Sequence, residues 1–328
     1  MSHTRALWTG LGTALASLLL SVAAPTGALA TSPGANGRIA FTSNLHGTWQ
    51  IYTMLPNGTR VRQVSHVPGS QENSMFPSRA PGGHRLAFSD AAGGTEDIYT
   101  INIDGTGQRR ITGGGADELA PAWSPDGNRI AFARFQTDGR GALWTMAPDG
   151  SHQRRLTAPA FNSGFLPIYT PDGRHIVYES SKGGLVAAVW IMNADGTNQR
   201  RLTPARFEGT PWDVSPDGQQ ILLGNHQNTA LQTALFVMNI DGTGLRRLTS
   251  AGCCFHDANA RYSPDGTTIA FTTDRSFAGR GIREAEIWEM SAAGNNPHPV
   301  TSSLTLGGCP DDLVVNCIGP LDWGTRRP

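Results

Sequence analysis

The chain has 328 residues with 26 basic and 26 acidic side chains, so its formal net charge is zero. Because bulk charge is balanced, the sequence does not favour a polyanion-binding protein, and we expect no nucleic-acid partner. Its 40 glycines and 21 prolines fall mostly at recurring turn positions, which favours a β protein.

Residues 1–30 have the pattern of a secretory signal peptide. Arg5 precedes an apolar run through Leu18–Val22, and Ala28-Leu29-Ala30 provides a small-x-small cleavage site. The alternative, a retained membrane anchor, would need a longer apolar run without interruptions. We therefore expect cleavage after Ala30, a linker at 31–36, and a mature chain that is secreted or periplasmic in the cell envelope, with no further transmembrane span.

A repeated phrase dominates the rest of the chain, and Ala120–Phe132 is its clearest copy. Pro125-Asp126-Gly127 is a tight-turn signal between two apolar, β-rich segments, so the phrase predicts a hairpin. Equivalent residues recur at intervals of about 45 residues, at Ala80, Ser124, Thr170, Ser215 and Ser263.

A second phrase follows in the same rhythm. It contains a strand such as Trp144-Thr145-Met146, an Asp149-Gly150 turn and an outer strand, Arg154-Arg155-Leu156-Thr157. Four short strands in about 45 residues are typical of a propeller blade. Six copies predict an all-β fold, a six-bladed β-propeller of four-stranded antiparallel blades over 37–328.

The two ends of the repeat region are complementary. Gly37–Phe41 reads as a second strand without a first, and Pro320–Gly324 reads as a first strand without a second. We therefore expect the C-terminal strand to complete the first blade and close the ring.

The predicted connections divide between the two faces of the ring. The Pro-Asp-Gly and Asp-Gly-Thr turns are short and nearly constant, and we call their side the short-turn face. The connections after the second and fourth strands vary in length and form the variable-loop face. Variable loops on a rigid scaffold are the usual place for recognition.

The tandem Pro-x-Trp-Ser-Pro-Asp-Gly-x-x-Ile-Ala-Phe and Asp-Gly-Thr-x-x-Arg-Arg-Leu-Thr phrases resemble the WD-like repeats of the TolB family over roughly 37–324. The resemblance covers the propeller portion only, without the N-terminal α/β domain that TolB carries before its propeller. It implies a periplasmic, TolB-like binding protein. The same repeat also occurs in peptidase accessory domains and polysaccharide lyases, so it specifies function less than fold.

The position three residues before the strand-one proline carries acidic side chains in three repeats. Its occupants are Ser74, Glu118, Gly164, Glu208, Asp257 and Cys317. One interpretation is an acidic channel rim that binds a cation or a basic peptide, with Glu118, Glu208, Asp257 and the adjacent His256 as ligand-binding residues. The other is that these carboxylates bind backbone N–H groups and fix their own loops, and the sequence favours this second interpretation.

Four histidines fall in predicted connections of the variable-loop face: His46, His66, His226 and His256. A lyase-like metal site would need several of them to converge, and no close metal-binding spacing is present. The Asn-x-Asp-Gly-Thr segments lack the later bidentate Glu of a calcium loop and are expected to be turns. We therefore predict no metal, no cofactor and no catalytic residue.

The four cysteines, Cys253, Cys254, Cys309 and Cys317, lie in two successive connections. An even number in an exported chain predicts two disulfides. A vicinal Cys253–Cys254 bond would be strained, and the sequence does not choose between the two cross-loop pairings. The recurring Arg-Arg pairs are expected to protect the outer edge of each blade from pairing with another edge.

Together these features favour a monomeric, non-enzymatic propeller that binds an envelope or extracellular protein or peptide through the variable-loop face. The alternative is an extracellular polysaccharide lyase or hydrolase with a His and carboxylate site at the channel mouth.

Overall fold

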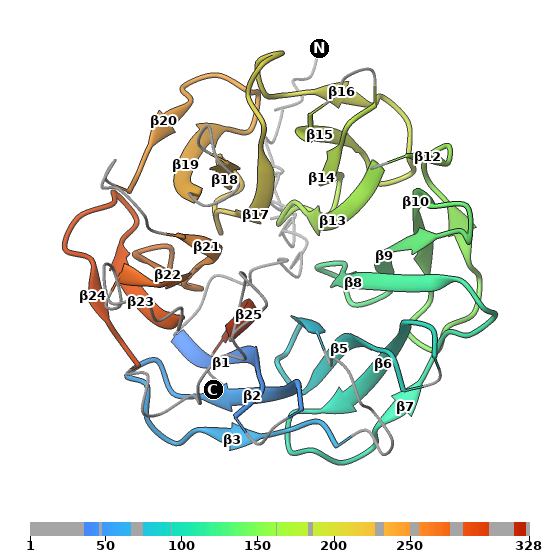
Figure 1. Ribbon diagram of the computed structural model, residues 1–328, viewed down its shortest axis with the longest axis horizontal. Helices are drawn as coiled ribbons and strands as arrows, with labels where there is room; N and C mark the ends of the chain where they lie inside the picture. Colours follow the sequence, from blue (N-terminus) through green and yellow to red (C-terminus); the bar gives the residue numbers. More distant parts are fainter. Residues whose placement is uncertain are drawn as a thin grey trace, which may run out of the picture.

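A computed structural model describes residues 36–45, 48–66, 75–92, 94–161, 163–182, 186–226, 233–249, 256–275, 285–301 and 318–325. These residues form six antiparallel sheets arranged in a ring, a β-propeller (Figure 1). The described part of the chain contains no helix long and apolar enough to span a membrane.

Each blade has its innermost strand first, and the fourth strand lies at the outside. The first three blades consist of β25 (Ile318–Thr325), β1 (Asn36–Ser43), β2 (Gln50–Met54) and β3 (Arg62–Gln63); of β4 (Met75–Arg79), β5 (Arg85–Asp90), β6 (Asp97–Asn102) and β7 (Arg109–Arg110); and of β8 (Asp117–Trp123), β9 (Ile130–Phe135), β10 (Arg140–Met146) and β11 (Arg154–Arg155), with β12 (Ala160–Phe161) also paired to β10.

The last three blades repeat the plan. They consist of β13 (Ser163–Tyr169), β14 (His175–Ser180), β15 (Ala188–Asn193) and β16 (Arg200–Arg201); of β17 (Thr210–Val214), β18 (Gln220–His226), β19 (Thr233–Asn239) and β20 (Arg246–Arg247); and of β21 (Ala258–Tyr262), β22 (Thr268–Thr273), β23 (Glu286–Ser291) and β24 (His298–Pro299).

The ring closes as the sequence predicts. Strand β25 is the innermost strand of the first blade and pairs with β1, so that Trp323 lies opposite Ile39 and Leu321 opposite Phe41 (Figure 1). An apolar cluster joins these residues to Ala270 and others of the last blade. The two ends of the propeller are thus held together by a shared sheet and a shared core.

The fourth-strand hydroxyl has the same function in all six blades. The Thr or Ser that ends the Arg-Arg-Leu-Thr phrase accepts a hydrogen bond from a backbone N–H of the third strand, as Thr112 does from Ile98 at 2.8 Å. The other five pairs are Ser65 with Ile51, Thr157 with Leu143, Thr203 with Val189, Thr249 with Leu235 and Thr301 with Ile287. The hydroxyl satisfies the donor where the short outer strand stops.

The Arg-Arg pairs make contacts that the sequence did not indicate. The first arginine reaches the next blade on the short-turn face: Arg154 donates to the carbonyl of Asp195 at 3.0 Å, and Arg200 to that of Asp241 at 3.2 Å. The second arginine donates within its own blade, as Arg201 does to the carbonyl of Thr203 at 2.9 Å. The pairs therefore link neighbouring blades, in addition to placing charge on the outer edge.

Candidate functional site

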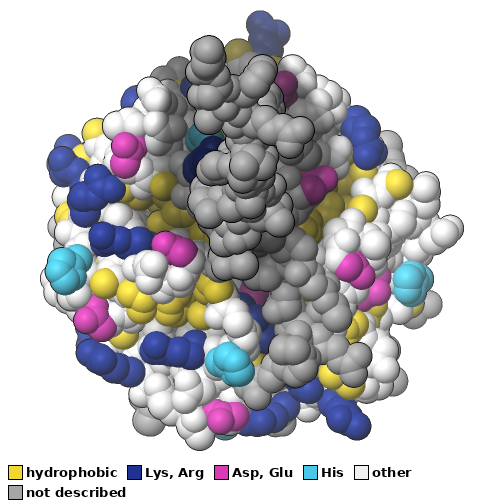
Figure 2. All heavy atoms as spheres, turned by 180° about the vertical axis from the view of Figure 1, so that it is seen from behind, with side chains coloured by type: hydrophobic (Ala, Val, Ile, Leu, Met, Phe, Trp, Pro, Cys, Tyr) yellow, Lys and Arg dark blue, Asp and Glu magenta, His cyan; other side chains and the backbone are white. Residues whose placement is uncertain are grey.

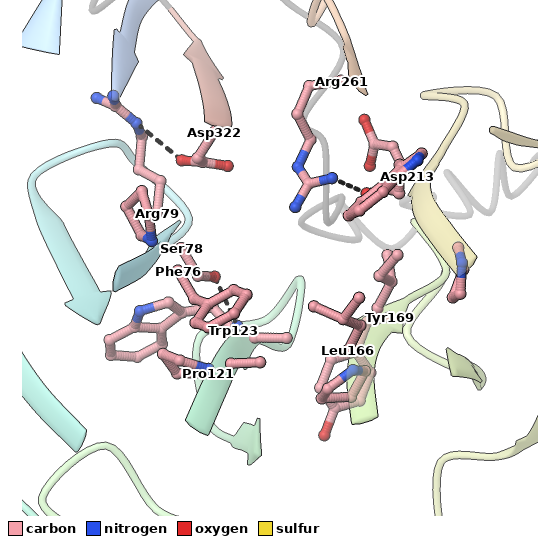
Figure 3. Close-up of a pocket in the computed structure, with 17 residues that line it drawn as sticks. Phe76, Ser78, Arg79, Pro121, Trp123, Leu166, Tyr169, Asp213, Arg261 and Asp322 are labelled. Atoms are coloured by element: carbon pink, nitrogen blue, oxygen red, sulfur yellow. Dashed lines mark hydrogen bonds and ion pairs between the residues drawn. The ribbon is translucent and has the colours of Figure 1, made fainter. Parts of the chain in front are cut away.

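The central channel is lined by the innermost strand of every blade and encloses a cavity of about 90 Å³. The residue between the proline and the aromatic position of the Pro-x-Trp-Ser phrase faces this region in each blade. These residues are Ser78, Ala122, Ile168, Asp213, Arg261 and Asp322. Figure 3 shows charged side chains on one side of the channel and apolar ones on the other.

Asp213 is a buried acid of the channel whose carboxylate contacts two backbone N–H groups. Its carboxylate accepts the backbone N–H of Val214 at 2.9 Å and that of Tyr262, in the next blade, at 2.8 Å. Burial raises the pKa of Asp213 to about 6, although Arg261 and the two backbone donors act in the opposite direction. Asp213 thus links two blades and carries a carboxyl that titrates near neutral pH.

Asp322 has a similar position in the closing strand. Its carboxylate lies 3.4 Å from Nε of Arg79 in the second blade, and the side chain of Arg79 is only 7% exposed. Burial raises the pKa of Asp322, and the charges of Arg79 and Arg261 reduce that effect. A Cβ on Gly324 would overlap the side chain of Arg79, so a larger residue after Trp323 would displace Arg79 from its present position.

Ser78 occupies the same repeat position as Asp213 and Asp322, and it shows that a side chain at this position can link neighbouring blades. Ser78 Oγ accepts the backbone N–H of Trp123 in the next blade at 3.2 Å. Asp213 accepts the backbone N–H of Tyr262 in the same way, so both side chains connect neighbouring blades. In Figure 3, Arg79, Asp322, Arg261 and Asp213 lie along one side of the channel.

The apolar side of the channel ends in an aromatic cluster formed by Phe76, Phe135 and Phe165. The ring centroids of Phe76 and Phe165 are 5.5 Å apart in an edge-to-face arrangement, and those of Phe135 and Phe165 are 6.1 Å apart. All three side chains are half-buried. They come from the starts of inner strands or the end of a second strand, so the cluster lies towards the variable-loop face.

The backbone beneath this cluster is unusual. Phe76 and Leu166 have φ angles of 55° and 50°, and each precedes a proline at an irregularity in the pairing of the inner strand. Ala120 and Asn259 have φ angles of 51° and 52° at the equivalent points of β8 and β21, where the pairing is also irregular. The bulge is therefore a feature of the repeat, and in two blades it lies next to the aromatic cluster.

Glu118 and Asp257 both lie in buried ion pairs within their own blades. Glu118 is 1% exposed and contacts Nε of Arg134 at 2.8 Å. Asp257 is also 1% exposed, and it contacts Nη2 of Arg275 at 2.5 Å and the hydroxyl of Thr273 at 2.7 Å. The structure therefore places these carboxylates inside the blades and away from an open rim.

The other members of the predicted acidic position differ. Glu208 is half-buried, and its carbonyl accepts from Nδ2 of Asn225. Gly164 has a φ angle of 76°, in the left-handed region that favours glycine. Ser74 and Cys317 lie outside the described residues, as do Cys253, Cys254 and Cys309, so the disulfides remain a prediction.

His256 forms a dyad with Asp274. Its Nδ1 lies 2.8 Å from one carboxylate oxygen, and its backbone N–H donates to the other at 2.8 Å. Burial alone would raise the pKa of Asp274, but the hydrogen bonds from His256 hold it below its usual value. Nε2 of His256 is buried and has no partner among the described residues.

Among the remaining histidines of the variable-loop face, the backbone of His226 comes near that of His256, because Thr233 pairs with His226 and also forms a β-bridge with His256. His66 is exposed, with Nδ1 3.2 Å from Nε2 of Gln63 in the first blade. His226 is the last residue of β18, and its backbone pairs with Thr233. His46 lies outside the described residues. Over the described ranges, no group of three or more His, Cys, Asp or Glu side chains could hold a metal ion.

Sequence reasoning missed Glu96, which follows the second strand of the second blade. Burial raises its pKa to about 7, and the nearby charges of Asp117 and Asp90 add to this effect. Its backbone N–H donates to Asp117 at 3.1 Å. Acidic residues are dense at 90–97 and 117–118, which indicates a site with raised pKa values. The repeat pattern, however, singles out only Glu118 among them.

The missed channel residues had a clearer signal. Asp213, Arg261 and Asp322 occupy the x position of the Pro-x-Trp-Ser phrase, where other repeats have Ser, Ala or Ile. A charged residue at a position that faces the channel is a candidate for function. At the position three residues before the proline, Glu118 and Asp257 lie within their blades, whereas Glu208 is half-buried.

The outer surface agrees with the balanced composition. Figure 2 shows Lys and Arg side chains around the rim of one face, interspersed with Asp and Glu. This distribution gives no continuous basic stripe among the described residues of that face.

Comparisons with known proteins agree on the fold. Residues 67–230 match the family of TolB beta propeller domains. A TolB homolog from Chlorobaculum tepidum is 30% identical over 120 residues, which are 37% of this chain and 26% of that protein. The matched segment is therefore about a quarter of the relative's length.

Solved structures extend the similarity to most of the ring. TolB from Acinetobacter baumannii superimposes with a TM-score of 0.71 and 19% identity, over 88% of this chain and 67% of the other. An oligogalacturonate lyase in complex with manganese has a TM-score of 0.56 and 14% identity, over 79% and 72% of the two chains. At these identities the likeness concerns the fold alone.

Proposed function

The chain belongs to the family of TolB β-propeller domains, and on this premise we propose that it is a secreted or periplasmic, non-enzymatic protein that binds a protein or peptide through its variable-loop face. The observation that carries the proposal is the aromatic cluster of Phe76, Phe135 and Phe165 at that end of the channel. Export is inferred from the leader pattern of residues 1–30.

The aromatic cluster suits protein recognition for three reasons. Its rings are only half-buried, so they keep apolar surface that a partner can cover. Aromatic side chains supply much contact area at a small cost in conformational entropy. The proline that follows Phe76 restricts the backbone beneath the ring, which reduces the ordering needed on binding.

Charged side chains of the channel, next to the aromatic cluster, could pair with a charged side chain of a bound polypeptide. Beyond the cluster, the channel offers Arg261 and Asp213, whose charges could receive a side chain of either sign. The cavity of about 90 Å³ accommodates one side chain or a few water molecules rather than a folded segment. We therefore propose that a partner covers the aromatic cluster and inserts at most one side chain into the channel.

The proposal is tested by capture from an envelope extract with the immobilised chain, followed by affinity measurement with the purified captured protein. The Phe76→Ala/Phe165→Ala variant should weaken that affinity at least about tenfold, because the loss of two aromatic contacts is expected to exceed about 1.4 kcal/mol. Arg109→Gln, on the outer strand, is the matched control. Equal affinity of all three proteins, each with a normal melting curve, would contradict the proposal.

The alternative function is an extracellular polymer lyase or hydrolase. The specific observation in its favour is the His256–Asp274 dyad, in which the carboxylate orients an imidazole whose Nε2 has no partner in the described structure. Cleavage of polygalacturonate or another extracellular polymer that is lost in His256→Ala, but retained in Phe76→Ala, would favour this alternative.

A further inference from the structure

A larger pocket lies on the short-turn face, between the first and second blades. Its volume is about 660 Å³. Three arginines line it, Arg38 from β1, Arg62 from β3 and Arg79 from β4. Apolar residues contribute as well, notably Leu55, Pro56 and Ile103. The pocket thus combines guanidinium groups with apolar walls, on the face opposite to the aromatic cluster.

The repeat provides an internal comparison. The equivalent pocket between the third and fourth blades has a volume of about 290 Å³ and is lined by Arg129, Arg154 and Tyr169. These residues occupy the repeat positions of Arg38, Arg62 and Arg79, respectively. The larger pocket therefore has a third arginine where its counterpart has a tyrosine.

The two pockets also differ in acidic side chains. The smaller pocket contains Asp126 and Asp172, the aspartates of the two flanking Pro-Asp-Gly turns. In the second blade the turn reads Pro81-Gly82-Gly83, without an aspartate. In the first blade, Thr325-Arg326-Arg327 follows the inner strand in the sequence, so no Pro-Asp-Gly turn occurs there either. Both carboxylates of the repeat are therefore absent from the larger pocket.

The acids that remain near the larger pocket are already engaged. Asp104 lines it, and its Oδ1 accepts from the backbone and the hydroxyl of Thr106 at 3.0 and 2.6 Å. Its charge also acts on Arg62, which donates to the backbone carbonyl of Asp104, so Asp104 offsets part of the charge of Arg62. Asp322 is paired with Arg79. Neither carboxylate contacts Arg38 among the described interactions, so the charge of Arg38 is not neutralised locally.

The surroundings of Arg38 support this conclusion. Its Nε donates to the hydroxyl of Thr53 at 3.2 Å, and its Nη2 donates to the carbonyls of Thr53 and Arg60 at 3.3 and 2.5 Å. All three acceptors are neutral. Burial lowers the pKa of Arg38, and the positive charges of Arg62, Arg79 and Arg60 lower it further. An anion in the pocket would relieve this repulsion.

We propose that this pocket binds a peptide segment in which a carboxylate side chain stands next to an apolar one. Guanidinium groups attract carboxylates, and Arg38 and Arg62 place two such charges on one side of the pocket. Some of their donors already bond to Thr53, Arg60 and the carbonyl of Asp104, so the two positive charges and the remaining N–H groups would hold the carboxylate. Leu55, Pro56 and Ile103 offer the apolar surface that an adjacent leucine-sized side chain would cover. The site is independent of the proposed binding at the variable-loop face.

The test uses fluorescence anisotropy of the full chain with a labelled peptide of sequence Gly-Ser-Asp-Leu-Asp-Leu-Ser-Gly. Its matched control replaces both Asp by Asn, and inorganic phosphate serves as a competitor. We expect the acidic peptide to bind at least about tenfold more tightly than the amide peptide, with the difference decreasing as salt rises. Equal binding of the two peptides, or no binding of the acidic one, would overturn the proposal.

Two variant pairs locate the site. Arg62→Gln should weaken binding of the acidic peptide about fivefold, whereas Arg109→Gln, the same repeat position one blade later and outside the pocket, should not. Gly82→Asp restores the missing turn carboxylate and should weaken binding, whereas Gly82→Asn carries the same backbone strain without the charge and should not. If an arginine variant fails to fold, the comparison of Gly82→Asp with Gly82→Asn still tests whether the charge of the pocket recognises the peptide.

The remaining outcomes are also decisive. If Gly82→Asp and Gly82→Asn bind the acidic peptide equally well, the charge of the pocket is not what recognises it. If phosphate displaces the peptide at a concentration equal to the peptide's own dissociation constant, the pocket is a site for simple anions and the peptide assignment is wrong. Displacement only at far higher phosphate concentrations supports the proposal.

Discussion

Trp323, near the end of the chain, lies opposite Ile39, near the beginning of the described residues, in the sheet formed by β25 and β1. Trp323 is 5% exposed and Ile39 is fully buried, and both belong to the cluster that includes Ala270 of the last blade. The closing strand therefore contributes both hydrogen bonds and core to the junction between the last blade and the first.

Deletion of residues 318–328 should lower the melting temperature by more than about 10 °C, because it removes the inner strand of a blade together with the buried side chains of Leu321 and Trp323. Differential scanning calorimetry on the shortened and full chains would measure this. An unchanged melting temperature would show that the closing strand does not hold the ring together.

A second prediction compares two glycines with positive φ, Gly150 in the turn between a third and a fourth strand and Gly94 in a connection between a second and a third strand. Gly150 has a φ angle of 90°, and a Cβ there would overlap the carbonyl oxygen of Ile111 in the previous blade. Gly94 has a φ angle of 85°, but a Cβ there would meet nothing within 4 Å. Gly94→Ala should therefore cost about 1 kcal/mol in unfolding free energy, through backbone strain alone.

Gly150→Ala should cost about 2–4 kcal/mol, because steric overlap between blades is added to the same strain. Urea unfolding of the two variants gives the comparison directly. Equal losses would mean that the turn glycines are required only for their backbone conformation and not for the close approach of neighbouring blades.

The sequence predicted the fold well because its strongest signals are local and repeated. Each Pro-Asp-Gly turn fixes a hairpin, and the complementary end phrases around Phe41 and Trp323 indicate the closure, so blade number and strand order follow. These predictions are confirmed by the six four-stranded paths and by the pairing of β25 with β1.

The site was less accessible to sequence reasoning because it depends on contacts between blades. Whether Glu118 faces a channel or Arg134 is decided by the side-chain packing of one blade, and the repeat does not encode it. The contact between Arg154 and the carbonyl of Asp195 likewise depends on the distance between two turns that are far apart in the sequence. The sequence shows that Gly82 replaces the turn aspartate beside the pocket of Arg38, but the arginines that line this pocket are brought together only in the folded ring.

A third prediction separates the two interpretations of the acidic position. Glu118→Ala leaves Arg134 without its buried partner and should cost about 2–4 kcal/mol in unfolding free energy. Glu208→Ala, at the same repeat position but half-buried, should change it by less than about 0.5 kcal/mol. Thermal unfolding of both variants measures this difference. Weakened partner binding by Glu118→Ala with unchanged stability would instead favour a ligand-binding rim.

The last prediction concerns Glu96, whose pKa is raised to about 7 from an ordinary value near 4.5, chiefly by burial and then by the charges of Asp117 and Asp90. The folded chain therefore binds a proton at this site between about pH 4.5 and 7, where the unfolded chain has released it. Folding stability must fall as pH rises through that window. Glu96→Gln removes the ionisable group, so the variant should match the wild type near pH 4.

At pH 8 the Glu96→Gln variant should be more stable than the wild type by about 1–2 kcal/mol, after allowance for partial exposure of the carboxyl. Asp138 provides a control of opposite sign, since hydrogen bonds from Arg140 hold its pKa below the usual value. Asp138→Asn should therefore lose stability relative to the wild type at neutral pH, and the difference should close as the pH falls through the acid range. Urea titrations of the three proteins at several pH values measure both trends. A Glu96→Gln variant that is no more stable at pH 8 than at pH 4, relative to the wild type, would show that Glu96 is ionised in the folded chain without penalty.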